Sequence, residues 1–308
     1  MKRLLPFLVI AAVVALSGFW WVTRPVAAIT GEDAALLEKG GDAARGEIAF
    51  HAGGCASCHM TPGQKDRKIL GGGLELKTAF GTFVAPNISS HKTDGIGAWS
   101  AAHLANAMQR GVSPDGAHYY PAFPYTTYAH AKLEDIRDLM AFLRTTPAVD
   151  GKAPGHDLSF PFSFRRGIGL WKALFLNSDM ISDDPAKPAD WNSGRYLVEA
   201  LGHCAECHSP RNPAGGIVAG QRFAGGPDPE GRGWVPNITG KGLGSWSVGD
   251  VSELLATGFT PDYDSVGASM ADVVKNTSAL SKADRDAMAV YIKSLPAAEG
   301  PPRPALQK

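Results

Sequence analysis

Two copies of one five-residue pattern contain every cysteine of the chain. They read Cys55-Ala56-Ser57-Cys58-His59 and Cys204-Ala205-Glu206-Cys207-His208. C-x-x-C-H is the attachment pattern for c-type haem, in which two thiols add to the porphyrin vinyl groups and the adjacent histidine binds the iron. We therefore predict two covalently bound haem c groups, attached through Cys55, Cys58, Cys204 and Cys207, with His59 and His208 as axial iron ligands.

Other uses of paired cysteines explain less of this pattern. Two disulfides, a redox-active dithiol and a four-thiolate zinc site are the alternatives. Each of them leaves the two histidines without a role. The repeated histidine therefore favours haem over a disulfide or a zinc site.

The ligand on the opposite side of each iron is a separate question. In an electron-transfer cytochrome c this ligand is usually methionine, which raises the reduction potential. Met270 is the expected ligand of the second haem, because it lies in a predicted loop ahead of the last helix. Met108, Met140 and Met288 fall in helical patterns and are expected to fill the core instead.

The first haem lacks an equivalent methionine. Counted from Gly111 and Gly258, Phe123 occupies the place that Met270 has in the second half. Phenylalanine cannot bind iron, so this haem is expected to be five-coordinate or to use another side chain. The candidates near Phe123 are His118, Tyr119, Tyr120, Tyr125, Tyr128 and His130, each of which is otherwise expected to be a hydrogen-bonded loop residue.

The surroundings of the two motifs repeat as well, which predicts a duplicated unit. Asn87 follows Cys58 by 29 residues, and Asn237 follows Cys207 by 30. Each unit continues with a Gly-x-Gly-x-Trp-Ser segment and closes with a helix before a proline, at 134–144 and 281–293. Asn87, Asn237, Trp99 and Trp246 are expected either to bind haem propionates or to be turn and core residues of the repeat.

These landmarks predict an all-α fold with two tandem cytochrome c-like domains, each around a covalently bound haem. The predicted domains span 31–150 and 190–297, joined by a proline-containing connector at 151–189 and followed by a proline-rich tail at 298–308. Residues 1–30 form a predicted signal anchor. In it Lys2 and Arg3 precede an uncharged run from 4 to 22, which indicates an N-terminal transmembrane helix with the rest of the chain outside the cytoplasm.

The aromatic and basic residues at the end of this run favour an anchor that is not cleaved. Trp20, Trp21 and Arg24 lie where an interfacial belt is expected. The alternative is cleavage after the imperfect small-residue site at 26–28.

The composition of the chain argues against a nucleic-acid partner. The chain has 308 residues, with 30 Lys and Arg against 30 Asp and Glu, so it has no basic excess for binding nucleic acid. The hydrophobic fraction of 44% is enough for ordinary cores in about two domains.

Three segments outside the haem motifs identify a family resemblance. They are Phe80-Gly81-Thr82-Phe83-Val84-Ala85-Pro86-Asn87-Ile88, Gly95-Ile96-Gly97-Ala98-Trp99-Ser100 and Tyr120-Pro121-Ala122-Phe123-Pro124-Tyr125. Over about 40–297 the chain resembles the cytochrome c subunits of bacterial membrane-bound alcohol and gluconate dehydrogenases. In that family the last segment typically reads Y-P-A-M-P-Y and its methionine binds iron, whereas here Phe123 stands in that position.

The resemblance implies an electron carrier with no catalytic residue of its own. A membrane-anchored periplasmic protein of the bacterial inner membrane is expected, which takes electrons from a dehydrogenase and passes them to a quinone, another cytochrome or an oxidase. The alternative is a dihaem oxidoreductase, similar to peroxidases or thiosulfate-oxidising cytochromes, that acts at the first haem. A haem-based sensor would need a signalling domain, and the sequence suggests none.

Overall fold

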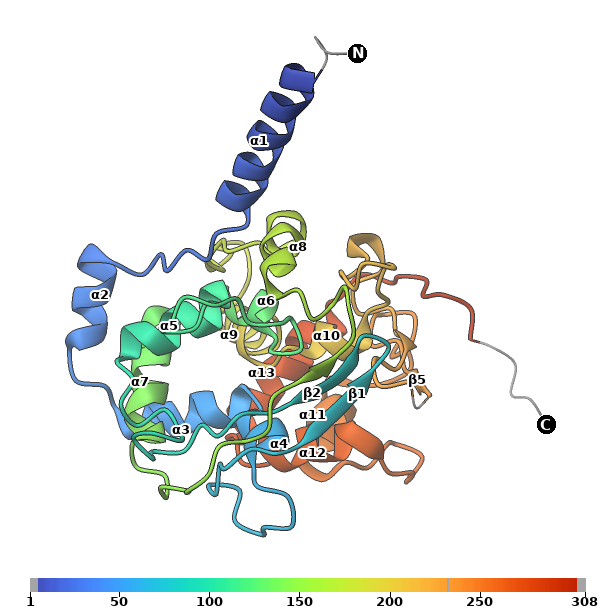
Figure 1. Ribbon diagram of the computed structural model, residues 1–308. Helices are drawn as coiled ribbons and strands as arrows, with labels where there is room; N and C mark the ends of the chain where they lie inside the picture. The colour runs from blue at the N-terminus through green and yellow to red at the C-terminus, as the bar shows by residue number, and fades with distance from the viewer. Residues whose placement is uncertain (1–4, 232, 304–308) are drawn as a thin grey trace.

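The computed structural model describes residues 5–231 and 233–303, and helices dominate it (Figure 1). The two halves of the chain contain helices in the same order, with a short helix at each C-x-x-C-H motif. The first half has α3 (Ala43–Ala52), α4 (Cys55–His59), α5 (Ala101–Arg110), α6 (Tyr125–Tyr128) and α7 (Leu133–Leu143). The second half has α9 (Ala189–Tyr196), the π-helical turn η2 (Leu197–Leu201), α10 (Cys204–His208), α11 (Val248–Thr257), α12 (Ala268–Thr277) and α13 (Lys282–Lys293). The prediction of a mostly helical fold is confirmed.

Short strands depart from the all-α prediction. A three-stranded antiparallel sheet and a two-stranded one are formed by β1 (Glu75–Thr78), β2 (Gly81–Val84), β3 (Asp157–Leu158), β4 (Gly226–Pro227) and β5 (Trp234–Val235). The β1–β2 hairpin pairs Glu75 with Val84. The turn ends at Gly81, whose φ of 123° suits glycine, and the following threonine, phenylalanine and valine favour extended backbone.

The first and last helices of each half pack against each other at a glycine. A Cβ on Gly46 in α3 would lie 1.9 Å from the carbonyl oxygen of Asp138 in α7. A Cβ on Gly194 in α9 would lie 1.8 Å from the carbonyl oxygen of Ala287 in α13. Any side chain at these two positions would therefore push the paired helices apart.

Aromatic side chains fill the space beside these crossings. The Phe142 ring lies 5.0 Å from the Phe50 ring, measured between centroids, and the Tyr291 ring lies 5.2 Å from the Trp191 ring. These contacts join the closing helix of each half to the helix that precedes its haem motif, as core packing does.

Three serines begin helices as their spacing predicts. Ser100, Ser247 and Ser281 each accept a hydrogen bond from the backbone N–H three residues later, at the starts of α5, α11 and α13. The Asp284 carboxylate accepts in turn from the Ser281 backbone N–H, which completes a capping box. The two final helices run over 133–143 and 282–293, within one residue of the predicted bounds.

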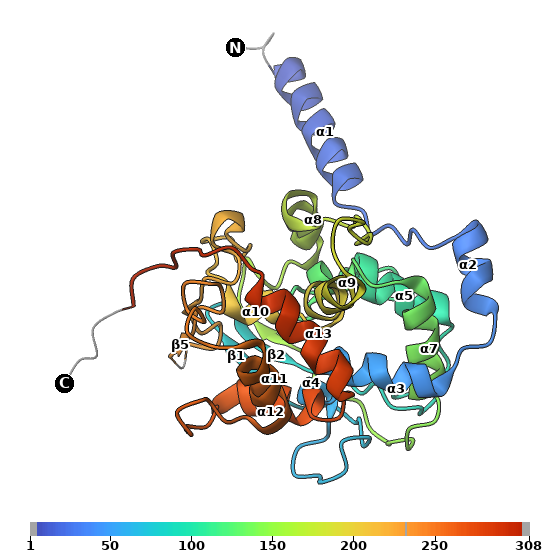
Figure 2. The ribbon, with the colours of Figure 1, turned by 180° about the vertical axis from the view of Figure 1, so that it is seen from behind.

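The remaining helices belong to the N-terminal segment, the connector and one loop. They are α1 (Leu5–Val22), α2 (Gly31–Glu38), η1 (Arg165–Gly167), α8 (Ile168–Phe175) and η3 (Ala219–Gln221). In both views α1 projects from the body of the protein, with α8 near its base (Figures 1 and 2). Within 5–231 and 233–303 the structure has no helix with both the length and the apolarity needed to cross a membrane. Lys2, Arg3 and the end of the predicted tail, 304–308, lie outside the described residues.

Candidate haem sites

Each C-x-x-C-H motif forms a single short helix that starts after a left-handed residue. Gly54 precedes Cys55 with φ 64°, and His203 precedes Cys204 with φ 41°. This backbone reversal lets both cysteines and the histidine of one motif face the same side of one helical turn. All four thiols are free, so the disulfide alternative is not formed.

The two motif histidines make the same hydrogen bond. His59 Nδ1 donates to the carbonyl oxygen of Pro86 over 2.8 Å, and His208 Nδ1 donates to that of Pro236 over 2.8 Å. A carbonyl oxygen only accepts, so the proton lies on Nδ1 and the lone pair of Nε2 is free for a metal. The carbonyl also fixes the ring orientation, as hydrogen-bond partners of metal-binding histidines do.

Protonation of the donor atoms agrees with haem attachment. Burial lowers the pKa of both His59 and His208, so their imidazoles are neutral, which is the form that binds iron. Burial also raises the pKa of the thiols, to about 12 for Cys55 and Cys204 and to about 11 for Cys58 and Cys207. A four-thiolate zinc site needs thiolates, which burial disfavours at these four cysteines. The donor set therefore fits haem c.

Asn87 and Asn237 act as turn residues of the repeat, which was one of the two roles predicted for them, the other being propionate binding. The Asn87 side-chain amide donates to the carbonyl oxygens of Val149 and Gly151, and the Asn237 amide donates to that of Ala298. These bonds hold the Pro86 and Pro236 loops to the end of each half, with the proline carbonyls aimed at the histidines. The proline carbonyls themselves were not predicted as site groups, although the repeated Pro-Asn-Ile segment is their signal.

Met270 is not in the predicted loop. It is the third residue of α12, partly buried and packed against the core. Sequence reasoning missed this helix because Gly267 and the run of polar residues before it are typical of a loop. Met108, Met140 and Met288 lie in the core, each no more than 5% exposed, as predicted.

Phe123 lies at the corresponding place in the first half, two residues before α6, and is likewise packed against the core. Its ring contacts three tyrosines, with centroid distances of 5.8 Å to Tyr119, 6.4 Å to Tyr125 and 5.6 Å to Tyr128. The Tyr128 hydroxyl donates to the carbonyl oxygen of Gly53 over 2.6 Å. The Tyr125 hydroxyl is buried and has no hydrogen-bond partner among the described residues.

The geometry of His118 is unfavourable for an iron ligand. Its Nε2 donates to the carbonyl oxygen of Thr23 over 2.8 Å, and its Nδ1 accepts from Lys172 Nζ over 3.0 Å. Both ring nitrogens are therefore used at the base of α1. Burial lowers the pKa of Lys172 to about 7, and two backbone carbonyls also accept from its ammonium group. His130 Nδ1 donates to the carbonyl oxygen of Asp179, which leaves its Nε2 as a candidate.

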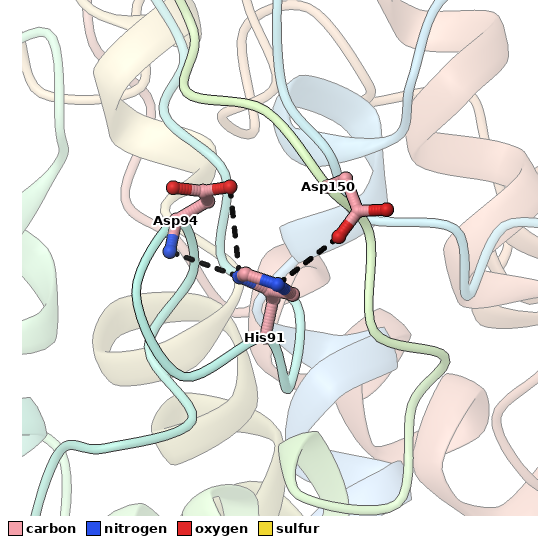
Figure 3. Close-up of side chains that lie close together, drawn as sticks. All are labelled: His91, Asp94 and Asp150. Carbon is pink, nitrogen blue, oxygen red and sulfur yellow. Dashed lines mark hydrogen bonds and ion pairs between the residues drawn. The ribbon is translucent and has the colours of Figure 1, made fainter.

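A separate cluster of His91, Asp94 and Asp150 joins two loops (Figure 3). His91 Nε2 lies 3.1 Å from Asp150 Oδ1, and His91 Nδ1 accepts from the Asp94 backbone N–H over 3.0 Å. Asp94 Oδ2 in turn accepts from the Gly151 backbone N–H. Both imidazole nitrogens have partners within the protein, so this cluster ties the loop after Pro86 to the end of the first half.

The two haem motifs lie against each other. The Tyr128 ring of the first half packs at 5.8 Å and 90° on the His203 ring, which immediately precedes the second motif. A Cβ on Gly54 would lie 3.3 Å from His203 Nε2. The residues that begin the two attachment helices therefore abut.

Comparisons with known proteins agree with this arrangement. The cytochrome c family profile matches residues 43–147. A protein of Cereibacter sphaeroides described as "Diheme cytochrome c-type" is 51% identical over 281 residues, which cover 91% of this chain and 93% of that protein.

Dehydrogenase subunits show a more distant likeness. The fructose dehydrogenase cytochrome subunit of Gluconobacter japonicus is 36% identical over 82% of this chain and 52% of its own length. The cytochrome c subunit of the quinone-dependent alcohol dehydrogenase of Gluconobacter oxydans is 35% identical over 82% of this chain and 54% of its own length. The chain thus spans about half the length of these two subunits. Because the likeness to the first relative covers both attachment helices over nearly the whole of each protein, this chain belongs to the dihaem c-type cytochromes, which are related to the cytochrome c subunits of such dehydrogenases.

Proposed function

We propose that this protein relays single electrons from a dehydrogenase to a quinone, another cytochrome or an oxidase of the respiratory chain. The observation that carries the proposal is the pair of matched histidines, each with Nε2 available and Nδ1 held by a proline carbonyl, in two motifs that abut. Bound haem supplies reversible one-electron chemistry. The chain contributes fixed ligands, burial of the donor groups and a short path between the two sites.

In our proposal the second half supplies both axial ligands of its haem iron. His208 is the proposed proximal ligand and Met270 the proposed distal one, because Met270 lies ahead of the last helix of the same half and is partly buried against the core. His59 is the proximal ligand of the first haem. Its distal side is lined by Phe123 and the tyrosines around it, with the unpartnered Tyr125 hydroxyl nearby.

The first site favours one alternative function. A phenylalanine in place of the methionine supplies no donor atom to the iron, so a first haem with an open coordination position is a candidate for peroxidase-like or thiosulfate-oxidising chemistry. Added ligands distinguish the two functions. A relay keeps both irons six-coordinate, whereas an enzyme needs an open coordination position on one of them.

Absorption and EPR spectra of the purified protein, with carbon monoxide or cyanide added, test the relay. We expect two low-spin haems, the first with another side chain such as His130 as its sixth ligand, and less than about a tenth of the haem binding either added ligand. If about half of the haem binds them, and the variant Phe123→Met abolishes that binding, the first haem is an open site and the enzymatic alternative replaces the relay.

We further propose that α1 anchors the protein in the bacterial inner membrane, with the haem sites in the periplasm. The support is apolar surface, because Phe7, Val14 and Leu16 are each more than 60% exposed. At its end the Arg166 guanidinium lies 3.8 Å from the centroid of the Trp20 ring and also donates to the Trp20 carbonyl oxygen over 2.6 Å. The connector thus holds the base of α1.

Cell fractionation tests the anchor. We expect the full chain to stay in the membrane fraction through salt and carbonate washes and to be released by detergent. A chain that begins at Pro25 behind a cleavable signal is the matched control and is expected in the soluble periplasmic fraction with both haems. Recovery of the full chain in that soluble fraction would contradict the proposal.

A further inference from the structure

The residue before the second cysteine of each motif contacts the opposite half of the protein. In the first motif this residue is Ser57, and in the second it is Glu206. The histidine and cysteines explain haem attachment without either of them. Each nevertheless has hydrogen-bond partners in the other half of the chain.

The first of these contacts joins Ser57 to α12. The Asn276 side-chain amide, 1% exposed, donates to Ser57 Oγ over 2.7 Å. Its Oδ1 accepts from Arg67 Nη2, also of the first half, over 2.7 Å. Asn276 lies six residues after Met270 on the same helix, and α12 lies beside α4 in both views (Figures 1 and 2).

The second contact runs in the opposite direction. Glu206, 8% exposed, accepts hydrogen bonds at Oε1 from the hydroxyls of Thr126 and Thr127, over 2.7 and 2.9 Å. Its Oε2 accepts from Arg211 over 2.5 Å within its own half. Thr126 and Thr127 are in α6, which begins two residues after Phe123.

We infer that Ser57 and Glu206 form two reciprocal latches, each of which positions the distal segment of the other haem. The first latch is Ser57, Asn276 and Arg67, and the second is Glu206, Thr126 and Thr127. Each attachment helix therefore holds the segment that covers the neighbouring haem site. These are positioning residues, since none of them is placed to touch iron.

The physical reason for the latches is the burial of Asn276 and Glu206, one member of each latch. Buried polar groups whose hydrogen bonds are all made are rigid, and loss of one partner leaves the other unsatisfied. A shift of either attachment helix would break contacts to the opposite distal segment. The inference deepens the proposed relay by coupling the two sites, but backbone protection tests it independently of electron transfer.

Hydrogen exchange of the purified dihaem protein, followed by mass spectrometry, is the test. In Ser57→Ala we expect exchange in 268–277 to accelerate about five- to tenfold, with 125–128 unchanged. In Glu206→Ala we expect the same acceleration in 125–128. If Glu206→Ala fails to fold, the Thr126→Val/Thr127→Val double variant removes the same hydrogen bonds and is expected to loosen 125–128.

Matched controls remove a similar group within one half. Ser90→Ala deletes a hydroxyl that donates to the carbonyl oxygen of Thr146, and Glu199→Ala deletes a carboxylate bound to Arg222 and Tyr291. We expect neither control to change exchange in the opposite half. EPR signals should agree, with Ser57→Ala altering the second haem alone.

The inference is overturned if Ser57→Ala loosens only its own half, or if it and Ser90→Ala affect α12 equally. A protein that fails as a relay, by binding carbon monoxide at the first haem, would still show the crossed exchange pattern. Failure of the proposed relay and failure of the latches therefore give different results.

Discussion

Replacing Cys204 and Cys207 together by alanine is expected to leave one covalently bound haem per chain instead of two. The thioether bonds require these sulfur atoms, which begin and nearly end the single turn of α10. His208 remains in the variant, with its ring still fixed by the Pro236 carbonyl, but one nitrogen ligand does not hold a haem through purification. Intact-protein mass spectrometry and iron content measure the loss.

The reciprocal variant, Cys55→Ala with Cys58→Ala, controls for the site that remains. It should also retain one haem, and the absorption spectra of the two variants should sum to that of the unchanged protein. Retention of both haems in either variant would contradict attachment through these cysteines. Zinc in place of iron in the unchanged protein would contradict haem binding altogether.

The residues proposed to bind the haems were predictable because their chemistry depends on local spacing. The C-x-x-C-H segments, the capping serines and the amphipathic closing helices each involve neighbours within a few positions, so the sequence indicates them directly. Gly46 and Gly194 each lie nine or ten residues ahead of the first cysteine of a haem motif. Their close approach to backbone carbonyls of the closing helix became apparent only in three dimensions.

Groups that act over long separations were not predictable in this way. The Pro86 carbonyl that orients His59 comes from a loop 27 residues away, and its oxygen carries no signature of its own in the sequence. Ser57 and Asn276 are 219 residues apart and meet only because the two halves pack. The hairpin of β1 and β2 was missed for a different reason, since its strands are four residues each and sit between helical landmarks.

Met270→Leu is expected to lower the reduction potential of the second haem by on the order of 0.1 V or more. The methionine sulfur favours ferrous iron, whereas leucine fills nearly the same volume and offers no ligand. The second haem should then become high-spin and bind carbon monoxide, while the first haem keeps its spectrum. Spectroelectrochemical titration measures both potentials.

Met288→Leu is the matched control for this change. Met288 is in α13 of the same half and is 2% exposed in the core, so the substitution alters packing without removing the proposed ligand. We expect its second-haem potential to stay within the uncertainty of the titration. If Met270→Leu behaves like Met288→Leu, Met270 is not the distal ligand.

The size of the shift bears on the direction of electron flow. Phe123 denies the first haem a methionine sulfur, so its potential is expected to lie below that of the second haem. Electrons that enter at the first site then move downhill to the second. Met270→Leu removes this difference in reduction potential between the two haems. In the half-reduced protein we therefore expect the equilibrium share of electrons on the second haem to fall markedly. An unchanged share would mean that burial and charge, and not Met270, set the potential of the second haem.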